Sequence, residues 1–427
     1  MILKCQEDSF LKEFTTKLVE CIEDEFSISI SAGTQIKIKG VGIILENTIL
    51  FPEGGGQPCD EGVLRLEREG GTDELRVCHV FRRNGQVVHL VEERWDVPWN
   101  ELLPGTPVHQ LLSWHRRFYH MIQHSGQHLI SALAERMFQL DTLSWCLGSE
   151  SCYIELEQIT EDQYKTLEIE ANTFIGKDLR VSAHVYKEGD QELQKAKTRG
   201  LPEGHVGDVR VIEIENLDKN MCCGTHVSSL RQLEVIKFLG TGKKVFKKKK
   251  TCLLYFVVGR DKVFQKFDCM HKKEESISTI LNKLPEEHVT SITDMKEGLA
   301  VAKKTVKELQ KEVVMLIINA FKEEEPNPAL FCLHRPDGDL ELMNFISRQF
   351  KGMNVVLFLS IGEEEGNVLL EGPKDIITEL APKVSSVLIG KGVVSGNKFQ
   401  AKVSRLSCKK RVEDLIREAL TVQCRSA

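Results

Sequence analysis

Two short motifs carry the clearest chemistry in this sequence. His124 and His128, in the stretch HSGQH, are four residues apart, so on a helix both imidazoles project from one face about one turn apart. Cys222 and His226, in CCGTH, repeat that spacing with one sulfur and one nitrogen. Three imidazoles and a thiolate form a donor set typical of zinc. The two pairs together predict one zinc site.

Several alternatives surround this prediction. Either pair alone could recur by chance, but both in one chain favour a metal. Cys223 is a rival sulfur, although the four-residue step favours Cys222. His120 lies on the same face of the predicted helix. It could be a metal ligand, a group that supports a ligand, or a packed side chain. Gly126 indicates a close approach to the helix backbone. Ser125 stands where a zinc protease of the HExxH type needs its glutamate, which disfavours that class.

The residues before these motifs predict a small β domain. Residues 35–39 alternate apolar and polar side chains, and 41–45 and 48–51 are short apolar runs ended by polar residues, glycine or proline. Turn residues at 83–85 separate further short strands. We therefore expect a β-barrel-like or sandwich domain over residues 1–112.

The first metal motif should lie on a helix. A helix is predicted from 113 to 138, and Ser113 can cap it. Another helix near 160–175 and strands at 180–186 and 208–215 complete a mixed layer. These elements predict an α/β zinc-containing core over residues 113–262.

The last part of the chain is predicted as residues 263–427. The pattern is almost wholly helical from about 261 to 325, and Pro285 divides it into two helices. Short apolar strands then alternate with helices in a small α/β domain. The fold class of the whole chain is α+β.

Composition excludes several classes of protein. The 427 residues carry 57 basic and 63 acidic side chains, a net charge of −6, which excludes a general nucleic-acid coat. The charge is uneven, because residues 1–107 carry a net −8 and the remainder a net +2. Thirteen cysteines, an acidic start and the lack of a long apolar run predict a reduced, cytoplasmic protein without a membrane span.

Three motifs carry a resemblance to a known family. HSGQH, CCGTH and the glycine-rich loop EGGGQP at residues 53–58 resemble the metal signature and GGQ loop of the editing domain of alanyl-tRNA synthetase. The chain is most similar to freestanding alanyl-tRNA editing proteins of the AlaX type. The resemblance is specific from about residue 40 to 260 and weaker beyond 263. The family more often has CGGTH, so Cys223 is a departure that leaves the ligand positions intact.

The resemblance implies an ATP-independent hydrolase of translation fidelity. It would cleave the ester that links a wrong amino acid, chiefly serine, to tRNA(Ala), with one zinc ion per chain. A synthetase pocket built for alanine cannot strongly reject an added hydroxyl, so a second site must remove the errors. Thr48 stands where the family places a residue that binds the serine hydroxyl, and Gln57 and Gln127 are further candidate catalytic residues.

The resemblance also implies partners. The backbone of Gly54, Gly55 and Gly56 could contact the tRNA end or the oxyanion, or form a plain turn. The lysine run Lys247, Lys248, Lys249 and Lys250 is a candidate phosphate-binding patch or a solvated loop. In the family the C-terminal region helps to recognise tRNA or pairs subunits, so a homodimer is a further expectation.

Three hypotheses about function follow from the sequence. The first is a zinc-dependent deacylase, in which zinc either polarises the ester, activates water or anchors the substrate's amino group. The second is a non-catalytic module that binds tRNA or a synthetase through a fold with a structural zinc. The third is another zinc hydrolase acting on a small ester or amide.

Overall fold

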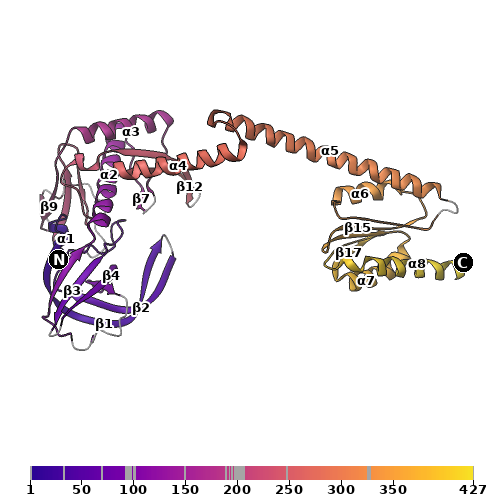
Figure 1. Cartoon of the computed structure of the whole chain (residues 1–427), viewed down its shortest axis with the longest axis horizontal. Helices are drawn as coiled ribbons and strands as arrows, with labels where there is room; N and C mark the ends of the chain where they lie inside the picture. Colours follow the sequence, from indigo (N-terminus) through magenta and orange to yellow (C-terminus); the bar gives the residue numbers. More distant parts are fainter. Residues whose placement is uncertain are drawn as a thin grey trace. The chain divides into compact units, whose positions relative to one another are not determined.

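The chain folds into two compact units, Met1–Lys273 and Glu274–Ala427 (Figure 1). The computed structural model describes residues 2–31, 34–68, 71–91, 99, 102–148, 151–187, 190–191, 193, 196, 207–246, 249–324 and 328–426. The predicted α+β class is confirmed, because helices and several separate sheets occur together. The domain boundaries at 112 and 262 stay predictions.

The first unit begins with a six-stranded sheet that closes on itself. A short helix precedes it, α1 (Lys4–Glu7). The strands are β1 (Glu13–Ser31), β2 (Thr34–Leu45), β3 (Gly62–Arg68), β4 (Gly71–Arg83), β5 (Gln86–Val91) and β6 (Pro107–Leu112). They pair in the order β1-β2-β5-β4-β3-β6, and β6 also pairs with β1, so the structure is a closed barrel. Alternating apolar residues such as Leu64, Leu66 and Val77 are fully buried in its core.

The predicted strand at 48–51 is wrong, because this buried segment is irregular and makes no ladder. Its backbone is satisfied by side chains instead. The N–H of Ile49 donates to Gln110 Oε1 at 3.0 Å, and the N–H of Phe51 donates to Asp60 Oδ2 at 2.7 Å. The apolar composition of this segment is typical of a strand. Its backbone N–H groups nevertheless donate to buried polar side chains and not to a neighbouring strand.

A central helix, α2 (Trp114–Phe138), carries the first metal motif, as predicted. Ser113 occupies the position before it, but its side chain makes no capping hydrogen bond. At the predicted second helix, α3 (Glu161–Gly176), the hydroxyl of Thr160 accepts a capping bond from the N–H of Gln163 at 3.2 Å.

Two small sheets and a 3₁₀ turn complete this unit. The sheet β11-β10-β9 is made of β9 (Val181–Tyr186), β10 (Val209–Ile214) and β11 (Asp218–Met221). The sheet β12-β13-β8-β7 is made of β7 (Ser144–Leu147), β8 (Cys152–Leu156), β12 (Ile236–Phe246) and β13 (Lys249–Val258). The turn η3 (Leu230–Leu233) connects them, and α2 packs in their common apolar core.

A buried ion pair fixes α2 to the barrel. Arg117 of α2 and Asp60, which precedes β3, are both fully buried. The Nε of Arg117 donates to Asp60 Oδ2 at 3.0 Å, and its Nη1 donates to the carbonyl of Ser9 at 2.9 Å. Because Asp60 also accepts from the N–H of Phe51, the pair fixes the segment 48–51 relative to α2.

The second unit consists of long helices and a five-stranded sheet. The helix α4 (Arg260–Leu281) leads into it, and the predicted break at Pro285 is confirmed, since η4 (Pro285–Glu287) separates α4 from α5 (His288–Glu323). The sheet order is β14-β15-β16-β18-β17, with only β14 and β15 parallel within the described residues. The other elements are β14 (Leu330–Arg335), α6 (Leu340–Gln349), β15 (Val356–Gly362), β16 (Gly366–Glu371), α7 (Lys374–Leu388), β17 (Gly390–Ser395), β18 (Lys398–Val403), η5 (Leu406–Cys408) and α8 (Lys409–Ser426).

The two faces of this sheet are covered by different helices. α5 and α6 pack on one face, and α7 and α8 pack on the other. Among the described helices of the chain, none combines the length and apolar character needed to cross a membrane. Twelve of the thirteen cysteines, from Cys5 to Cys408, are free thiols.

Candidate metal centre

The helix α2 presents two histidines from one face. His124 and His128 are buried, and their ring centroids are 5.1 Å apart. A Cβ atom on Gly126 would lie only 2.5 Å from Val258 Cγ2 of β13. This position therefore needs glycine, because the helix that carries both histidines lies directly against the sheet.

The loop after β11 supplies the other two donors. Cys222 and His226 lie in this loop, whose shape is held from inside the protein. The Nη1 of buried Arg210 donates to the carbonyls of Cys222 at 3.0 Å and Gly224 at 2.7 Å. From α1, the Nε2 of Gln6 donates to the carbonyl of Cys223 at 2.8 Å. The N-terminal segment thus helps to order the loop that carries half of the centre.

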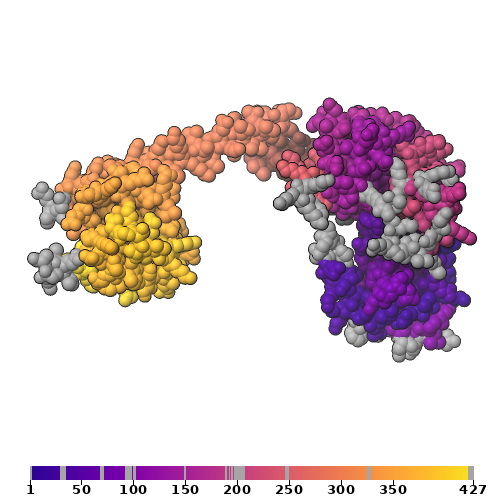
Figure 2. All heavy atoms as spheres, turned by 180° about the vertical axis from the view of Figure 1, so that it is seen from behind, coloured from indigo at the N-terminus to yellow at the C-terminus, as the bar shows by residue number. Residues whose placement is uncertain are grey.

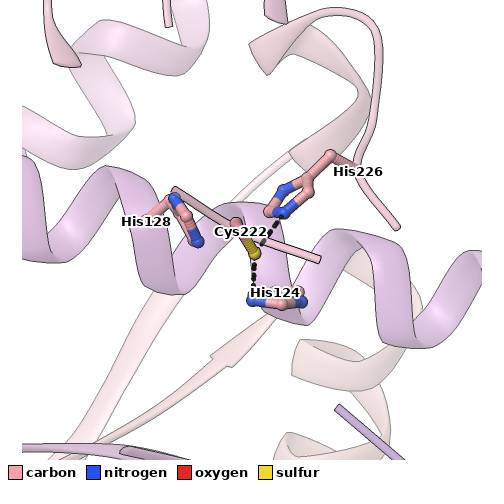
Figure 3. A group of neighbouring side chains, drawn as sticks. All are labelled: His124, His128, Cys222 and His226. Carbon is pink, nitrogen blue, oxygen red and sulfur yellow. Dashed lines mark hydrogen bonds between the residues drawn. The ribbon is translucent and has the colours of Figure 1, made fainter. Parts of the chain in front are cut away.

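Figure 3 shows the four side chains converging on one point. One donor atom from each of His124, His128, Cys222 and His226 lies within 4.8 Å of the others. The Sγ of Cys222 is 3.4 Å from His124 Nε2 and 3.3 Å from His226 Nε2. In a tetrahedral zinc site with ordinary Zn–S and Zn–N bonds, the sulfur–nitrogen edge is about 3.6 Å. The observed spacing therefore fits a four-coordinate zinc ion.

Burial keeps His124 and His226 neutral. The pKa values of His124 and His226 lie well below their ordinary value, chiefly because both rings are buried and secondly because other histidines face them. A neutral imidazole has a free lone pair for a metal. Burial, with Cys223 beside it, raises the pKa of Cys222 to about 12, so a metal that binds this sulfur displaces a proton.

Gln57 of the glycine-rich loop fixes the tautomer of His124. Its Oε1 accepts from the backbone N–H of Thr225 at 2.9 Å, which identifies that atom as the oxygen, and its Nε2 donates to Thr225 Oγ1 at 2.8 Å. The same Oε1 lies 2.9 Å from His124 Nδ1. Nδ1 must therefore carry the proton, so Nε2 has its lone pair directed toward the centre. Gln57 itself is fully buried.

Small residues make room for these contacts. A Cβ on Gly224 would lie 2.2 Å from His124 Cε1 and 2.8 Å from Gln57 Oε1, so a larger residue would displace the ring. The N–H of Gly224 points to Cys222 Sγ at 3.4 Å. Ser125 supports the remaining histidine: its Oγ lies 3.1 Å from His226 Nδ1 and accepts from the N–H of Val227 at 3.1 Å.

The other predicted catalytic residues have different surroundings. Thr48 is buried in the barrel, where its hydroxyl donates to Gln110 Oε1 at 2.8 Å and accepts from the N–H of Leu50 at 3.0 Å. Gln127 lies on α2 and donates to Ser131 Oγ at 2.9 Å, while its Oε1 is buried without a hydrogen-bond partner among the described residues. His120 is buried outside the four-residue group, and both its ring nitrogens likewise lack partners in the described part of the chain.

The predicted tRNA-contacting residues are only partly described. Gly55 and Gly56 are exposed and have φ angles of +59° and +80°, which explains the need for glycine. The N–H of Gly54 donates to the carbonyl of Gln57 at 3.1 Å and is already satisfied. Lys250 is exposed in β13 and Lys249 belongs to the same strand. Lys247 and Lys248 lie outside the described residues.

Several supporting residues were not predicted from the sequence. Ser125 and Thr225 lie inside the two motifs, so their positions could have indicated a supporting role. Gln6 lies 217 residues before Cys223, and Arg210 lies 12 residues before Cys222 with no local signal for its contacts with the loop. Trp145 is another supporting residue that was not predicted. Its Nε1 donates to the carbonyl of Gly55 at 3.0 Å, so the indole contacts the glycine-rich loop.

The segment around the second motif defines the class of domain. Residues 209–251, from β10 into β13, match the family model described as the threonyl and alanyl tRNA synthetase second additional domain. This stretch contains Cys222 and His226, two of the four grouped donors. Half of the donor set therefore lies in a stretch that matches a domain type of these two synthetases.

Whole-chain comparison identifies the family. The chain is 37% identical to the alanyl-tRNA editing protein Aarsd1 of Danio rerio over 98% of both chains. It is 36% identical to Aarsd1 of Mus musculus over 99% of both, and 28% identical to the putative alanyl-tRNA editing protein alaX of Saccharomyces cerevisiae over 95% of this chain and 93% of that protein. The chain belongs to the family of alanyl-tRNA editing proteins of the Aarsd1 type.

Proposed function

We propose that this protein is a zinc-dependent deacylase that acts in trans on mischarged tRNA(Ala), with Ser-tRNA(Ala) as its chief substrate. The observation that carries the proposal is the convergence of His124, His128, Cys222 and His226 in a protein of an alanyl-tRNA editing family. An activity in translation fidelity also supports a cytoplasmic location.

The four donors are suited to one zinc ion per chain. Three imidazoles, two of them on α2, and a sulfur at tetrahedral spacing match zinc better than a metal that prefers oxygen ligands. When bound there, zinc would supply Lewis acidity toward an ester carbonyl or a water molecule, or would hold the substrate's amino group.

The chain's own residues have separable roles in this proposal. Gln57 acts on substrate only through His124, so we assign it a positioning role. Gln127 is the better-placed polar group for substrate, because its buried Oε1 has no partner among the described residues and could accept from an amino group. Thr48 remains the candidate for the serine hydroxyl, although its own hydroxyl must first exchange its contact with Gln110.

Exposed groups near the centre are proposed to receive the tRNA. The exposed residues Gly55 and Gly56 lie on the same surface as the exposed Cys223. A Cβ atom on Gly55 would lie 3.2 Å from Cys223 Sγ. Lys250, with the rest of the lysine run, would contact phosphate.

The direct test is hydrolysis of tRNA(Ala) charged with serine, glycine or alanine. We expect the wild type to deacylate the seryl form fastest and to lose activity on addition of a zinc chelator. His124→Ala should be inactive, and the matched control His115→Ala, on the exposed side of the same helix, should retain activity. Intact, zinc-loaded wild type that leaves all three substrates uncleaved would refute the proposal.

A second function is favoured by the closed donor set. Four protein ligands without an open position are typical of structural zinc. Under this alternative the protein binds tRNA or a synthetase without turnover. Removal of zinc would then unfold the first unit, and Gln127→Ala would alter no activity because none exists. Measured turnover by the wild type would exclude this alternative.

A further inference from the structure

An indole that is not among the metal donors lies close to the metal centre. Trp145 of β7 is only partly buried, and its Nε1 donates to the carbonyl of Gly55 at 3.0 Å. A Cβ atom on Gly56 would lie 2.4 Å from Trp145 Nε1 and 2.8 Å from Trp145 Cδ1, so the loop backbone lies against one edge of the ring. The next loop residue is Gln57, which contacts His124. The indole is therefore held by the same loop that orients a metal donor.

The segment that leads into β7 is tied to the centre from a second direction. Thr142 Oγ1 donates to Ser131 Oγ at 2.7 Å, and Gln127 Nε2 donates to the same oxygen at 2.9 Å. The buried Oε1 of Gln127 accepts no hydrogen bond from the described residues, so it is available to a bound molecule. Residues 142–145 are thus connected to Gln127 at one end and to the glycine-rich loop at the other, which places them beside the metal centre.

Two apolar side chains of this segment lie on one face. The N–H of Leu143 donates to the carbonyl of Glu155 at 2.7 Å, so the pairing with β8 already begins before Ser144. Residues two apart in a strand share a face, and Leu143, which is 47% exposed, therefore lies on the same face as Trp145. We name these two side chains the indole platform.

The indole platform lies where two parts of the first unit meet. Figure 2 shows the indigo barrel in direct contact with the purple and magenta core of this unit. Trp145 belongs to the core, whereas Gly55 lies in the segment that connects β2 to β3 of the barrel. β7 is also an edge strand of its sheet in the described part of the chain. The platform is therefore accessible to a molecule bound at the centre.

We propose that the indole platform stacks on the terminal nucleobase of the tRNA 3′ end. This inference rests on the proposed function. Serine is small and polar, so the mischarged residue gives an indole and a leucine little to pack against. The ribose that carries the scissile ester also carries the terminal base, so a group that binds this base must lie beside the hydrolytic centre. Proteins bind unpaired bases by stacking them on aromatic side chains, and a ring already held by Gly55 loses little freedom on binding.

The first test uses uncharged tRNA(Ala), so it does not depend on turnover. Equilibrium binding is compared for RNA with the natural 3′-terminal adenosine and for RNA whose terminal nucleotide is abasic. Removal of the base should raise the dissociation constant of the wild type about 5–150-fold, the range expected for one stacked base. Trp145→Ala should bind both RNAs alike, with the affinity of the wild type for the abasic form. Equal affinity of the wild type for the two RNAs would overturn the proposal.

Two further variants separate stacking from a structural role. Trp145→Phe loses the donor to Gly55 but keeps an aromatic face, so it should retain most of the base dependence. Tyr153→Ala is the matched control, since it removes a partly buried ring from the opposite face of the same sheet, where Trp145 pairs with Ile154. It should retain the full base dependence. Loss of that dependence in Tyr153→Ala, or equal loss in Trp145→Phe and Trp145→Ala, would contradict stacking. Circular dichroism and zinc content verify that the variants fold.

Deacylation of Ser-tRNA(Ala) gives an independent measurement. A base that stays stacked before and during attack on the ester contributes equally to both states, so Trp145→Ala should raise KM by the same factor and keep kcat within about threefold. A fall in kcat at unchanged KM would overturn the proposal. Base-dependent binding without hydrolysis would refute the proposed deacylase and support the stacking site. Hydrolysis without base dependence would refute the stacking site alone.

Discussion

Replacing Gln57 by leucine should weaken zinc binding in addition to destabilising the fold. The substitution removes the acceptor of His124 Nδ1 and of the Thr225 N–H, and the donor to Thr225 Oγ1. Two stranded buried donors cost about 2–6 kcal/mol of folding free energy. Loss of a group that orients a metal ligand lowers metal affinity by about 10–100-fold, equivalent to roughly 1.4–2.8 kcal/mol.

The barrel offers a closely matched control. Gln110 is also fully buried, accepts two hydrogen bonds at Oε1 from Thr48 and Ile49, and donates one from Nε2 to the carbonyl of Asn47. Gln110→Leu should therefore cost a similar free energy of unfolding without changing the zinc dissociation constant. Both quantities are measurable, by urea denaturation and by competition with a chromogenic chelator.

A conservative variant sharpens the experiment. Gln57→Glu keeps an oxygen that can accept from His124 and Thr225, so its zinc affinity should lie closer to that of the wild type than that of Gln57→Leu. A dissociation constant of Gln57→Leu within twofold of the wild type would refute the reasoning. The same conclusion would follow if Gln110→Leu weakened zinc binding equally.

Three other outcomes are expected. Cys222→Ser should lose bound zinc while Cys223→Ser keeps about one ion per chain by elemental analysis; equal loss in both would contradict the assignment of the sulfur. Asp60→Ala leaves the buried guanidinium of α2 unpaired, so the free energy of unfolding in urea should fall by about 3–5 kcal/mol, and a loss under about 1 kcal/mol would be inconsistent with this role. Hydrogen bonds from Lys244 and two hydroxyls lower the pKa of Glu155 to about 2, below its ordinary value of 4.5. The stability that this carboxylate contributes should be complete above its ordinary pKa and be lost as the pH falls from there toward 2, and Glu155→Gln should lack that part of the urea–pH profile.

The grouping of the four candidate donors could be predicted from the sequence because each pair is local. A four-residue step brings His124 beside His128 on any helix, and the loop places Cys222 near His226. Pro285 similarly predicted a helix break from its own backbone chemistry. These predictions need no knowledge of the tertiary structure.

The support of the centre could not be predicted in this way. Gln57 reaches Thr225 across 168 residues, and Gln6 reaches Cys223 across 217 residues. Arg210 is only 12 residues from Cys222, but no local pattern indicates that its side chain turns back to the loop. The strand predicted at 48–51 was wrong because the side chains of Gln110 and Asp60 accept from its backbone N–H groups. A local sequence pattern indicates which secondary structure a segment prefers. Hydrogen bonds to residues elsewhere in the chain decide whether the folded protein adopts that structure.

The dispersed origin of the metal centre has a consequence for biosynthesis. Cys222 follows His128 by 94 residues, so a ribosome would complete the second donor pair roughly 5–20 seconds after the first. During that interval His124 and His128 have no sulfur ligand beside them. The loop to which Gln6 donates its hydrogen bond has not yet been synthesised. The full zinc affinity would therefore be reached only after the first 226 residues have been synthesised and the two donor pairs have come into contact. Zinc binding would then mark completed assembly of this part of the nascent chain.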